Sequence, residues 1–200
     1  MSLNIQLARH FTAKDIKEAP VPNGFRHLHF PDAAAQARKM RAIVAGLDNI
    51  TLLGHSEAIR ARYSLELSTI GIVDNVQPVQ IPNIFLPTDE ADLALVMSAC
   101  KVSLNPSTWT PEQQEALKHF GKIGAESIRK ALEDAGVTEG TALIFTHGPM
   151  INSLAAYLAG GDEGLVESLF RIDTKEGDRF EIGMDGSVYP VHHHPLVPVQ

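Results

Sequence analysis

The stretch that decides the fold runs from Thr141 to Leu158 and reads TALIFTHGPMINSLAAYL. Its first five residues, Thr141 to Phe145, form an apolar run that begins after a glycine and ends before His147-Gly148-Pro149. Such a short run is typical of a strand that is buried on both faces. From Met150 the apolar residues recur at helical spacing until a pair of glycines ends the pattern. The sequence therefore predicts a buried strand, a tight turn and a helix in direct succession.

His147 follows the carboxyl end of this predicted strand. Open α/β sheets bind ligands at the carboxyl ends of their strands, beside helix N-termini. Gly148 would let the backbone approach a ligand closely, and the free N–H groups of the following helix would attract an anion. A lone histidine is more often a surface residue at a capped strand end. The interpretation therefore depends on which residues stand at the ends of the other strands.

Composition and charge narrow the possible functions. The chain has 200 residues, of which 44% are hydrophobic and 20% charged, so we expect a single domain over residues 1–200. The net charge of −7 and the lack of a basic stripe argue against nucleic acid or an anionic membrane as the main partner. Cys100 is the single cysteine, which favours a reducing compartment. With no signal peptide or apolar run of bilayer length, we expect a cytoplasmic protein.

Two further strands are predicted before the decisive stretch, each followed by cationic or imidazole groups. Residues 3–8 alternate apolar and polar and lead directly into Arg9-His10. Residues 49–53 form a second buried strand, after which Ser56 would cap a helix that carries Arg60. Between them, Asp32 would cap a helix over 33–45.

The remaining segments give weaker signals. Residues 70–73 resemble a strand, and prolines then predict an irregular excursion to about residue 90, before a helix over 93–100. Thr110-Pro111-Glu112-Gln113 is a strong start for a helix to about residue 135. Strands are predicted over 168–173, 179–184 and 187–191, with an Asp185-Gly186 hairpin turn and an extended tail over 192–200.

The carboxyl ends of parallel strands meet at one edge of a sheet. We therefore expect Arg9, His10, Arg60 and His147 to converge there. Guanidinium groups match phosphate oxygens with paired hydrogen bonds, so this set predicts a phosphate pocket.

These motifs, in this order, resemble those of the histidine phosphatase superfamily. The family's Arg-His-Gly motif is similar to Arg9-His10-Phe11, and its second arginine is similar to Arg60 in Ser56-Glu57-Ala58-Ile59-Arg60-Ala61. Its late His-Gly is similar to His147-Gly148. The resemblance implies an α/β three-layer sandwich of phosphoglycerate-mutase-like type, with a mostly parallel central sheet flanked by helices.

The resemblance also implies a mechanism and a set of site residues. His10 would attack phosphorus and form a phosphohistidine, while Arg9, Arg60 and His147 stabilise the charge on the phosphoryl oxygens. Thr12 and Gly148 would add substrate contacts, and Asp89 or Glu90 would protonate the leaving oxygen. We expect a hydrolase of a small phosphorylated metabolite that needs no metal and no cofactor.

Some features depart from the family pattern. Phe11 replaces the motif glycine, so we expect it to restrict the backbone beside His10 and to crowd the pocket. Arg26-His27 is a competing match for the first motif. No acid follows His147, which disfavours the acid-phosphatase branch and leaves Asp89 or Glu90 as the proton donor.

Three other functions are compatible with the sequence. The chain could be a phosphoglycerate-mutase-like phosphotransferase, or a catalytically silent member that binds phosphorylated ligands or a protein partner. A metal protein could instead use His27, His29 and His192 to His194. Exposed apolar surface on the C-terminal strands would also suit a homodimer.

Overall fold

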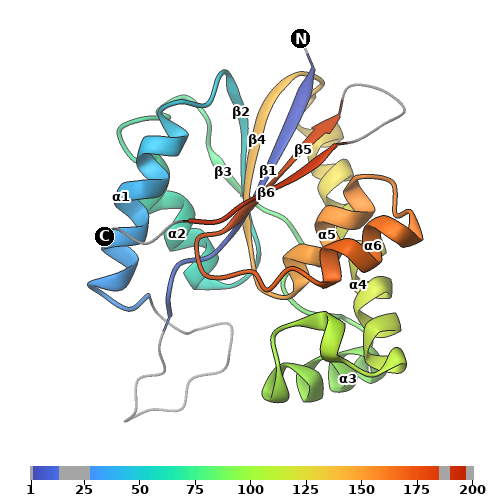
Figure 1. The fold of residues 1–200 in the computed structure, drawn as a ribbon. Coiled ribbons are helices and arrows are strands. Elements are labelled where there is room, and N and C mark those ends of the chain that lie inside the picture. The colour runs from blue at the N-terminus through green and yellow to red at the C-terminus, as the bar shows by residue number, and fades with distance from the viewer. Residues whose placement is uncertain (1, 14–27, 185–189, 197–200) are drawn as a thin grey trace.

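A computed structural model describes residues 2–13, 28–184 and 190–196 of the chain. The predicted class is confirmed, because a six-stranded mixed sheet lies between helices (Figure 1). The strands are β1 (Leu3–Arg9), β2 (Ile50–His55), β3 (Pro78–Gln80), β4 (Gly140–Thr146), β5 (Arg179–Met184) and β6 (Val191–His194). The helices are α1 (Asp32–Val44), α2 (Ile59–Thr69), α3 (Glu90–Val102), α4 (Pro111–Asp134), α5 (Met150–Leu158) and α6 (Glu163–Phe170), with a short 3-10 turn at Pro106–Thr108.

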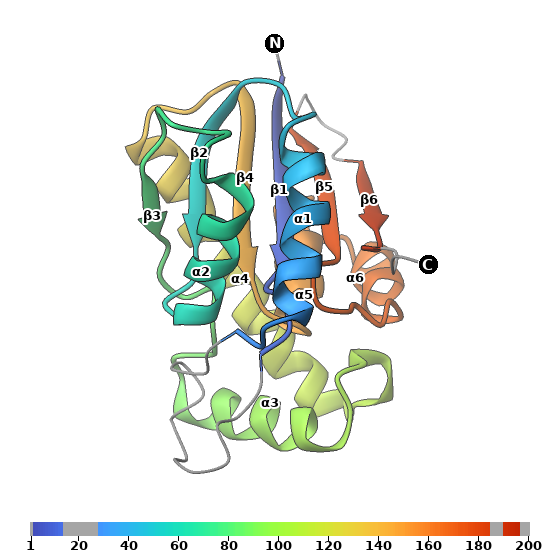
Figure 2. The ribbon, with the colours of Figure 1, turned by 90° about the vertical axis from the view of Figure 1, so that its left-hand side faces the viewer.

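The strand order is β3-β2-β4-β1-β5-β6. Strands β3, β2, β4 and β1 are parallel, and β5 and β6 add an antiparallel edge. The parallel part places the carboxyl ends of β1, β2 and β4 side by side. This edge of the sheet faces α3 (Figure 2).

Each face of the sheet has its own apolar core. Helices α1 and α2 cover one face around Met40, Leu65 and Phe145. Helices α4, α5 and α6 cover the other around Phe120, Leu154 and Phe180. The central strand β4 is buried along its whole length, because both faces are covered.

The segment that decides the fold forms as predicted. Residues 140–146 are β4 and Met150–Leu158 is α5. The start of α4 carries the predicted capping box between Thr110 and Gln113. Gly121 and Gly124 of α4 allow close contact with α5, since a Cβ on either would overlap the side chains of Ser153 or Leu154.

Several predicted elements are wrong. Residues 168–173 include the end of helix α6, whose Asp162 cap and buried Val166, Leu169 and Phe170 fit a helical face. Residues 70–73 form a turn in which the N–H groups of Ile72 and Val73 both donate to the carbonyl of Thr69. Both apolar side chains still pack against a core, which explains the strand-like pattern.

Two predicted caps also differ. Asp32 is the first residue of α1 and pairs with His29 at 2.9 Å, so it does not cap the helix. Ser56 lies two residues before Ala58, the N-cap residue of α2, and its Oγ contacts the N–H of Ala58 and His147 Nε2 instead of capping the helix. The histidines 192–194 belong to β6, and the Asp185-Gly186 turn lies outside the described residues.

Candidate active site

A pocket of about 470 Å³ opens at the carboxyl edge of the parallel strands. Four of its residues are the predicted set: Arg9 ends β1, His10 follows it, Arg60 lies in the first turn of α2, and His147 follows β4. Each of the four side chains is at least nine-tenths buried. The topology therefore brings together groups that are more than 130 residues apart in the sequence.

His10 is held by hydrogen bonds on both ring nitrogens. Its Nδ1 lies 2.6 Å from the carbonyl oxygen of Phe11, and its Nε2 accepts a hydrogen bond from Arg60 Nε at 3.1 Å. A carbonyl can only accept and a guanidinium can only donate, so Nδ1 carries the hydrogen. The lone pair of the neutral ring is therefore on Nε2, which is the form that a nucleophilic histidine requires.

His147 is a second, fully enclosed imidazole. Its ring centroid lies 4.8 Å from that of His10 and 4.6 Å from that of Phe85. Burial lowers the pKa of His147 well below its usual value, and the nearby His10, Arg60 and Arg9 lower it further. His147 is therefore neutral at physiological pH.

Ser56 sets the hydrogen position on His147. Ser56 Oγ lies 2.6 Å from His147 Nε2 and accepts a hydrogen bond from the N–H of Ala58 at 3.3 Å. If the hydroxyl donates to Nε2, the ring hydrogen of His147 lies on Nδ1. Among the described residues Nδ1 has no hydrogen-bond partner, although it is buried. An unpaired buried donor in a pocket suits an anionic oxygen.

Arg9 lies against the turn between β4 and α5. Its Nη1 donates to the carbonyl of Thr174, its Nη2 lies 3.2 Å from Glu176 Oε1, and its buried Nε lacks a partner among the described residues. A Cβ on Gly148 would lie 2.7 Å from the guanidinium carbon. Gly148 is thus required for the close approach of Arg9, in addition to lining the pocket. Burial lowers the pKa of Arg9, while nearby carboxylates, led by Glu176, oppose this shift.

Arg60 contacts both polar and aromatic groups. Besides its bond to His10, its guanidinium carbon lies 5.2 Å from the centroid of the Phe85 ring, within the range of a cation–π contact. Arg62, two residues further along α2, is exposed and pairs with Glu66 at 2.7 Å. The helix thus separates a site arginine from a surface arginine.

Other expected site residues lie elsewhere. Asp89 caps α3 by accepting hydrogen bonds from the N–H groups of Ala91 and Asp92, each at 3.0 Å. Glu90 is the exposed first residue of the same helix. Neither carboxylate lines the pocket. Thr12 does not line it either, and its N–H donates to Gln36 Oε1 at 2.7 Å.

Phe11 does not crowd the pocket, contrary to the expectation from the sequence. Its side chain is fully buried in the core beneath α1 and α2, where its ring meets that of Phe145 edge-on at 5.7 Å. Its N–H donates to Ser64 Oγ at 2.9 Å. The side chain after His10 therefore packs into the core on the α1 and α2 side of the sheet and does not line the pocket. The competing Arg26-His27 pair lies outside the described residues.

Two parts of the pocket wall have no recognisable signal in the sequence. One is Glu176, which lies in a segment interpreted only as a connection between strands. The other is an apolar wall that α3 and its flanking loops contribute, made of Phe85, Leu86, Met97, Cys100 and Leu104. Burial raises the pKa of the Cys100 thiol to about 11, so it is protonated at physiological pH. Lys101 lies at the same wall.

Two of the histidines in β6 lie beside carboxylates. His193 lies 3.4 Å from Asp178, and His194 lies 3.2 Å from Glu181. Across residues 2–13, 28–184 and 190–196, no group of three or more His, Cys, Asp or Glu side chains is arranged to hold a metal ion. Within the same ranges, no helix combines the length and the apolar character that crossing a membrane requires.

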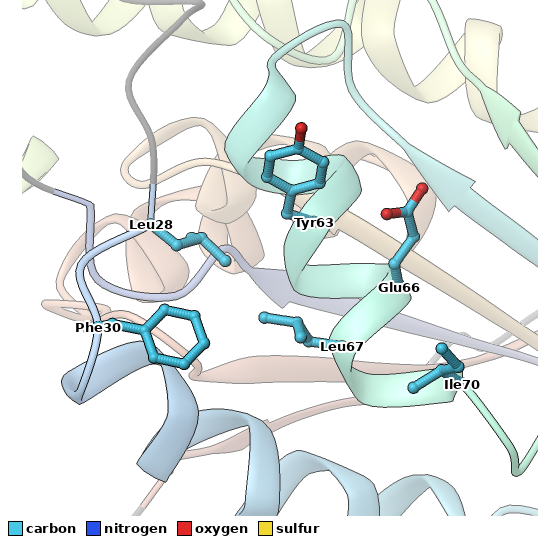
Figure 3. A pocket seen from close by; sticks show the side chains of 6 residues that line it. All are labelled: Leu28, Phe30, Tyr63, Glu66, Leu67 and Ile70. Carbon is cyan, nitrogen blue, oxygen red and sulfur yellow. The ribbon is translucent and has the colours of Figure 1, made fainter.

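A second pocket of about 370 Å³ lies on the outer side of α2, lined by Leu28, Phe30, Tyr63, Glu66, Leu67 and Ile70 (Figure 3). Glu66, the carboxylate among the described residues that line it, is paired with Arg62. None of these described residues is a histidine, serine or cysteine, and none of them lines the pocket around His10.

The architecture matches that of several solved structures. Phosphoglycerate mutase from Bacillus anthracis is similar with a TM-score of 0.66 and 13% identity, over 98% of this chain and 94% of the other. Alpha-ribazole phosphatase from Shigella flexneri has a TM-score of 0.64 and 18% identity, over 95% of each chain. The protein histidine phosphatase SixA, solved in complex with tungstate, has a TM-score of 0.61 and 13% identity, over 96% of this chain and 97% of the other.

The similarity to these proteins is seen in the structure and not in the sequence comparisons. No protein-family model matches the chain, and no curated protein matches it. The likeness therefore lies in the fold, and it covers nearly the whole length of both chains. The chain has a phosphoglycerate-mutase-like fold, as the resemblance of its motifs predicted.

Proposed function

We propose that this chain is a phosphomonoester hydrolase that works through a phosphohistidine at His10. The observation that carries this proposal is the pair of hydrogen bonds on the His10 ring. They fix the hydrogen on Nδ1 and leave the lone pair on Nε2, inside a pocket that also holds two arginines and a neutral histidine. This combines a nucleophile with groups that bind an anion.

The chemistry follows from the positions of these groups. His10 Nε2 attacks phosphorus in line, the N–P bond forms, and the bond to the leaving oxygen breaks. Arg9, Arg60 and the Nδ1–H of His147 donate to the three non-bridging oxygens, where negative charge is concentrated. Water then displaces His10 and releases inorganic phosphate.

The size of the pocket and the solved relatives support this class of substrate. A volume of about 470 Å³ lies within the range of sites for small molecules. Among the proteins of the same fold are an alpha-ribazole phosphatase, a SixA complex with the oxyanion tungstate, and a phosphoserine phosphatase from Entamoeba histolytica bound to phosphoserine. We extend phosphatase-type activity to this chain without assigning one of these substrates.

A catalytically silent protein is less well supported than an enzyme. That alternative rested on Phe11 narrowing the site, and Phe11 lies in the core on the other face of the sheet. The metal alternative has no cluster of ligands among the described residues.

The test is direct detection of the phosphoenzyme. The protein is mixed with a ³²P-labelled aryl phosphate and quenched in alkaline detergent, because phosphohistidine survives alkali and hydrolyses in acid. We expect a label that is stable in alkali, labile in acid and absent from His10→Ala. His193→Ala is the matched control, because His193 lies in β6 outside the pocket and its loss should leave the label intact.

Three outcomes separate the alternatives. A label without release of inorganic phosphate, but with transfer to an added alcohol, would indicate a phosphotransferase. Binding of phosphate without a label or turnover would indicate a silent binding protein. Turnover that persists in His10→Ala would overturn the assignment of the nucleophile.

A further inference from the structure

Glu176 is the one carboxylate among the described residues that line the pocket. Its Oε1 lies 3.2 Å from Arg9 Nη2, and its side chain is 36% exposed. One carboxylate oxygen therefore contacts a phosphate-binding arginine, and the side chain remains accessible to solvent. Asp89 and Glu90, which the sequence suggested for proton transfer, lie on α3 away from the pocket wall.

Glu176 is held in place by its own backbone. Its carbonyl accepts a hydrogen bond from Gln36 Nε2 at 3.2 Å, and the next residue, Gly177, donates its N–H to the carbonyl of Arg9 at 3.2 Å. The N–H of Arg9 in turn donates to the carbonyl of Asp178 at 2.8 Å. The segment around Glu176 is thus tied to the strand end that carries the nucleophile.

The buried carboxylate of Asp178 anchors the same segment. It accepts hydrogen bonds from the N–H groups of Lys175 and Leu196, each at 2.8 Å. A side chain supported in this way can keep a fixed position relative to bound substrate, which proton transfer requires.

We propose that Glu176 is the catalytic carboxylate that carries the proton in both halves of the reaction, an inference that rests on the proposed hydrolase function. In the first half, the protonated Glu176 donates to the leaving oxygen as the P–O bond breaks and the N–P bond to His10 forms. In the second half, the carboxylate takes a proton from water as the water oxygen bonds to phosphorus. The N–P electron pair then returns to His10 Nε2, and Glu176 is protonated for the next cycle.

The contact with Arg9 places Glu176 beside the position of the phosphoryl group. In the unliganded site the carboxylate is paired with the guanidinium. A phosphate bound by the same guanidinium would lie next to the carboxylate, within reach of its leaving oxygen.

The decisive experiment compares leaving groups in Glu176→Gln. Phenyl phosphate needs protonation of its leaving oxygen, whereas 2,4-dinitrophenyl phosphate does not. We expect kcat for phenyl phosphate to fall by about 100-fold or more. With 2,4-dinitrophenyl phosphate we expect a full burst of one phenolate per enzyme followed by slow turnover, because attack on phosphorus is retained and activation of water is lost.

Two further variants separate catalysis from a structural role. Glu176→Asp keeps a carboxylate and should recover part of the lost rate, and Glu167→Gln removes an exposed carboxylate of α6 and should change nothing. Binding of sulfate to Glu176→Gln should match the wild type, because a Gln oxygen can still accept from Arg9.

Each result has one meaning. Equal losses for both aryl phosphates in Glu176→Gln, together with weakened sulfate binding, would show that Glu176 only positions Arg9 and would overturn the inference. Unchanged kinetics would also overturn it. A wild-type protein that forms no phosphoenzyme on His10 would instead refute the proposed function on which the inference rests.

Discussion

Arg60 Nε donates a hydrogen bond to His10 Nε2 at 3.1 Å, which joins the first turn of α2 to the end of β1. In the mechanism that we propose, a bound phosphate would take over this guanidinium and release His10 Nε2 for attack on phosphorus. Both residues are nearly buried, so neither is positioned by bulk water.

This contact predicts that Arg60→Lys impairs catalysis. A lysine keeps the charge but lacks the planar fork that bonds His10 and stacks over Phe85. We expect kcat/KM for an aryl phosphate to fall by about 100-fold, the usual cost of losing a preorganised donor to a transition-state oxygen. Steady-state kinetics on the purified variant will measure this.

Arg62→Lys is the matched control on the same helix. Its guanidinium is exposed and its pair with Glu66 is a surface ion pair. We expect wild-type kinetics, and equal losses in the two variants would show that the position of Arg60 carries no catalytic role.

Gly148→Ala should disturb Arg9 without unfolding the protein. The added Cβ would lie 2.7 Å from the guanidinium carbon, so Arg9 must move. Because a displacement of about 1 Å in a site can cost about 100-fold in rate, we expect a loss of that order in kcat/KM. Gly46→Ala is the control, since its Cβ would meet nothing closer than 3.4 Å. Full activity in Gly148→Ala would contradict the need for this close approach.

Ser56→Ala should destabilise the fold by leaving His147 Nε2 buried without its hydrogen bond. We expect the free energy of unfolding in urea to fall by about 1–3 kcal/mol, the usual cost of an unsatisfied buried polar group. Ser168→Ala removes an exposed hydroxyl of α6 and should change stability far less. Similar losses in both variants would argue against the proposed pairing of Ser56 with His147.

The buried neutral His147 predicts a loss of stability in acid. Its pKa is lowered in the folded state, whereas in the unfolded chain it is about 6.5. Below that pH the unfolded chain binds a proton that the folded chain does not, so stability falls with pH by at most about 1.4 kcal/mol per unit. Well above that pH, His147 is neutral in both states and adds no pH dependence to the stability.

His147→Gln isolates this effect from that of the other ionisable groups. The difference between the pH profiles of the free energy of unfolding should appear below about pH 6.5. Parallel profiles for the two proteins over that pH range would show that His147 binds a proton as readily in the folded protein as in the unfolded chain.

Gly121→Ala should affect stability but leave the chemistry of the site intact. Its Cβ would overlap Ser153 where α4 packs on α5, and neither Gly121 nor Ser153 lines the pocket. We expect a loss of about 1–3 kcal/mol in the free energy of unfolding, the usual cost of overpacking. Glu126→Ala, on the exposed side of α4, should cost much less. An unchanged free energy of unfolding in Gly121→Ala would show that α4 and α5 can move apart with little loss of stability.

Much of the fold could be predicted because its signals are local. The apolar run before His147 lies between Gly140 and His147-Gly148-Pro149, which favours a short buried strand, and the spacing from Met150 favours one face of a helix. The capping box at Thr110 likewise depends on residues three apart. Residues 168–173 were assigned wrongly because a short apolar run does not distinguish a strand from the end of a helix.

The sequence by itself determined the elements that carry the site, β1, β2, β4 and α5, and which residue types follow the strand ends. Only the tertiary structure decided that Phe11 points to the core under α1 and α2, that Asp89 caps α3 without lining the pocket, and that Glu176 lies beside Arg9. The physical reason is that these outcomes depend on the face of a sheet, the position of a helix end and the path of a distant loop. All three outcomes depend on packing between segments that are far apart in the chain, and a local sequence pattern does not predict such packing.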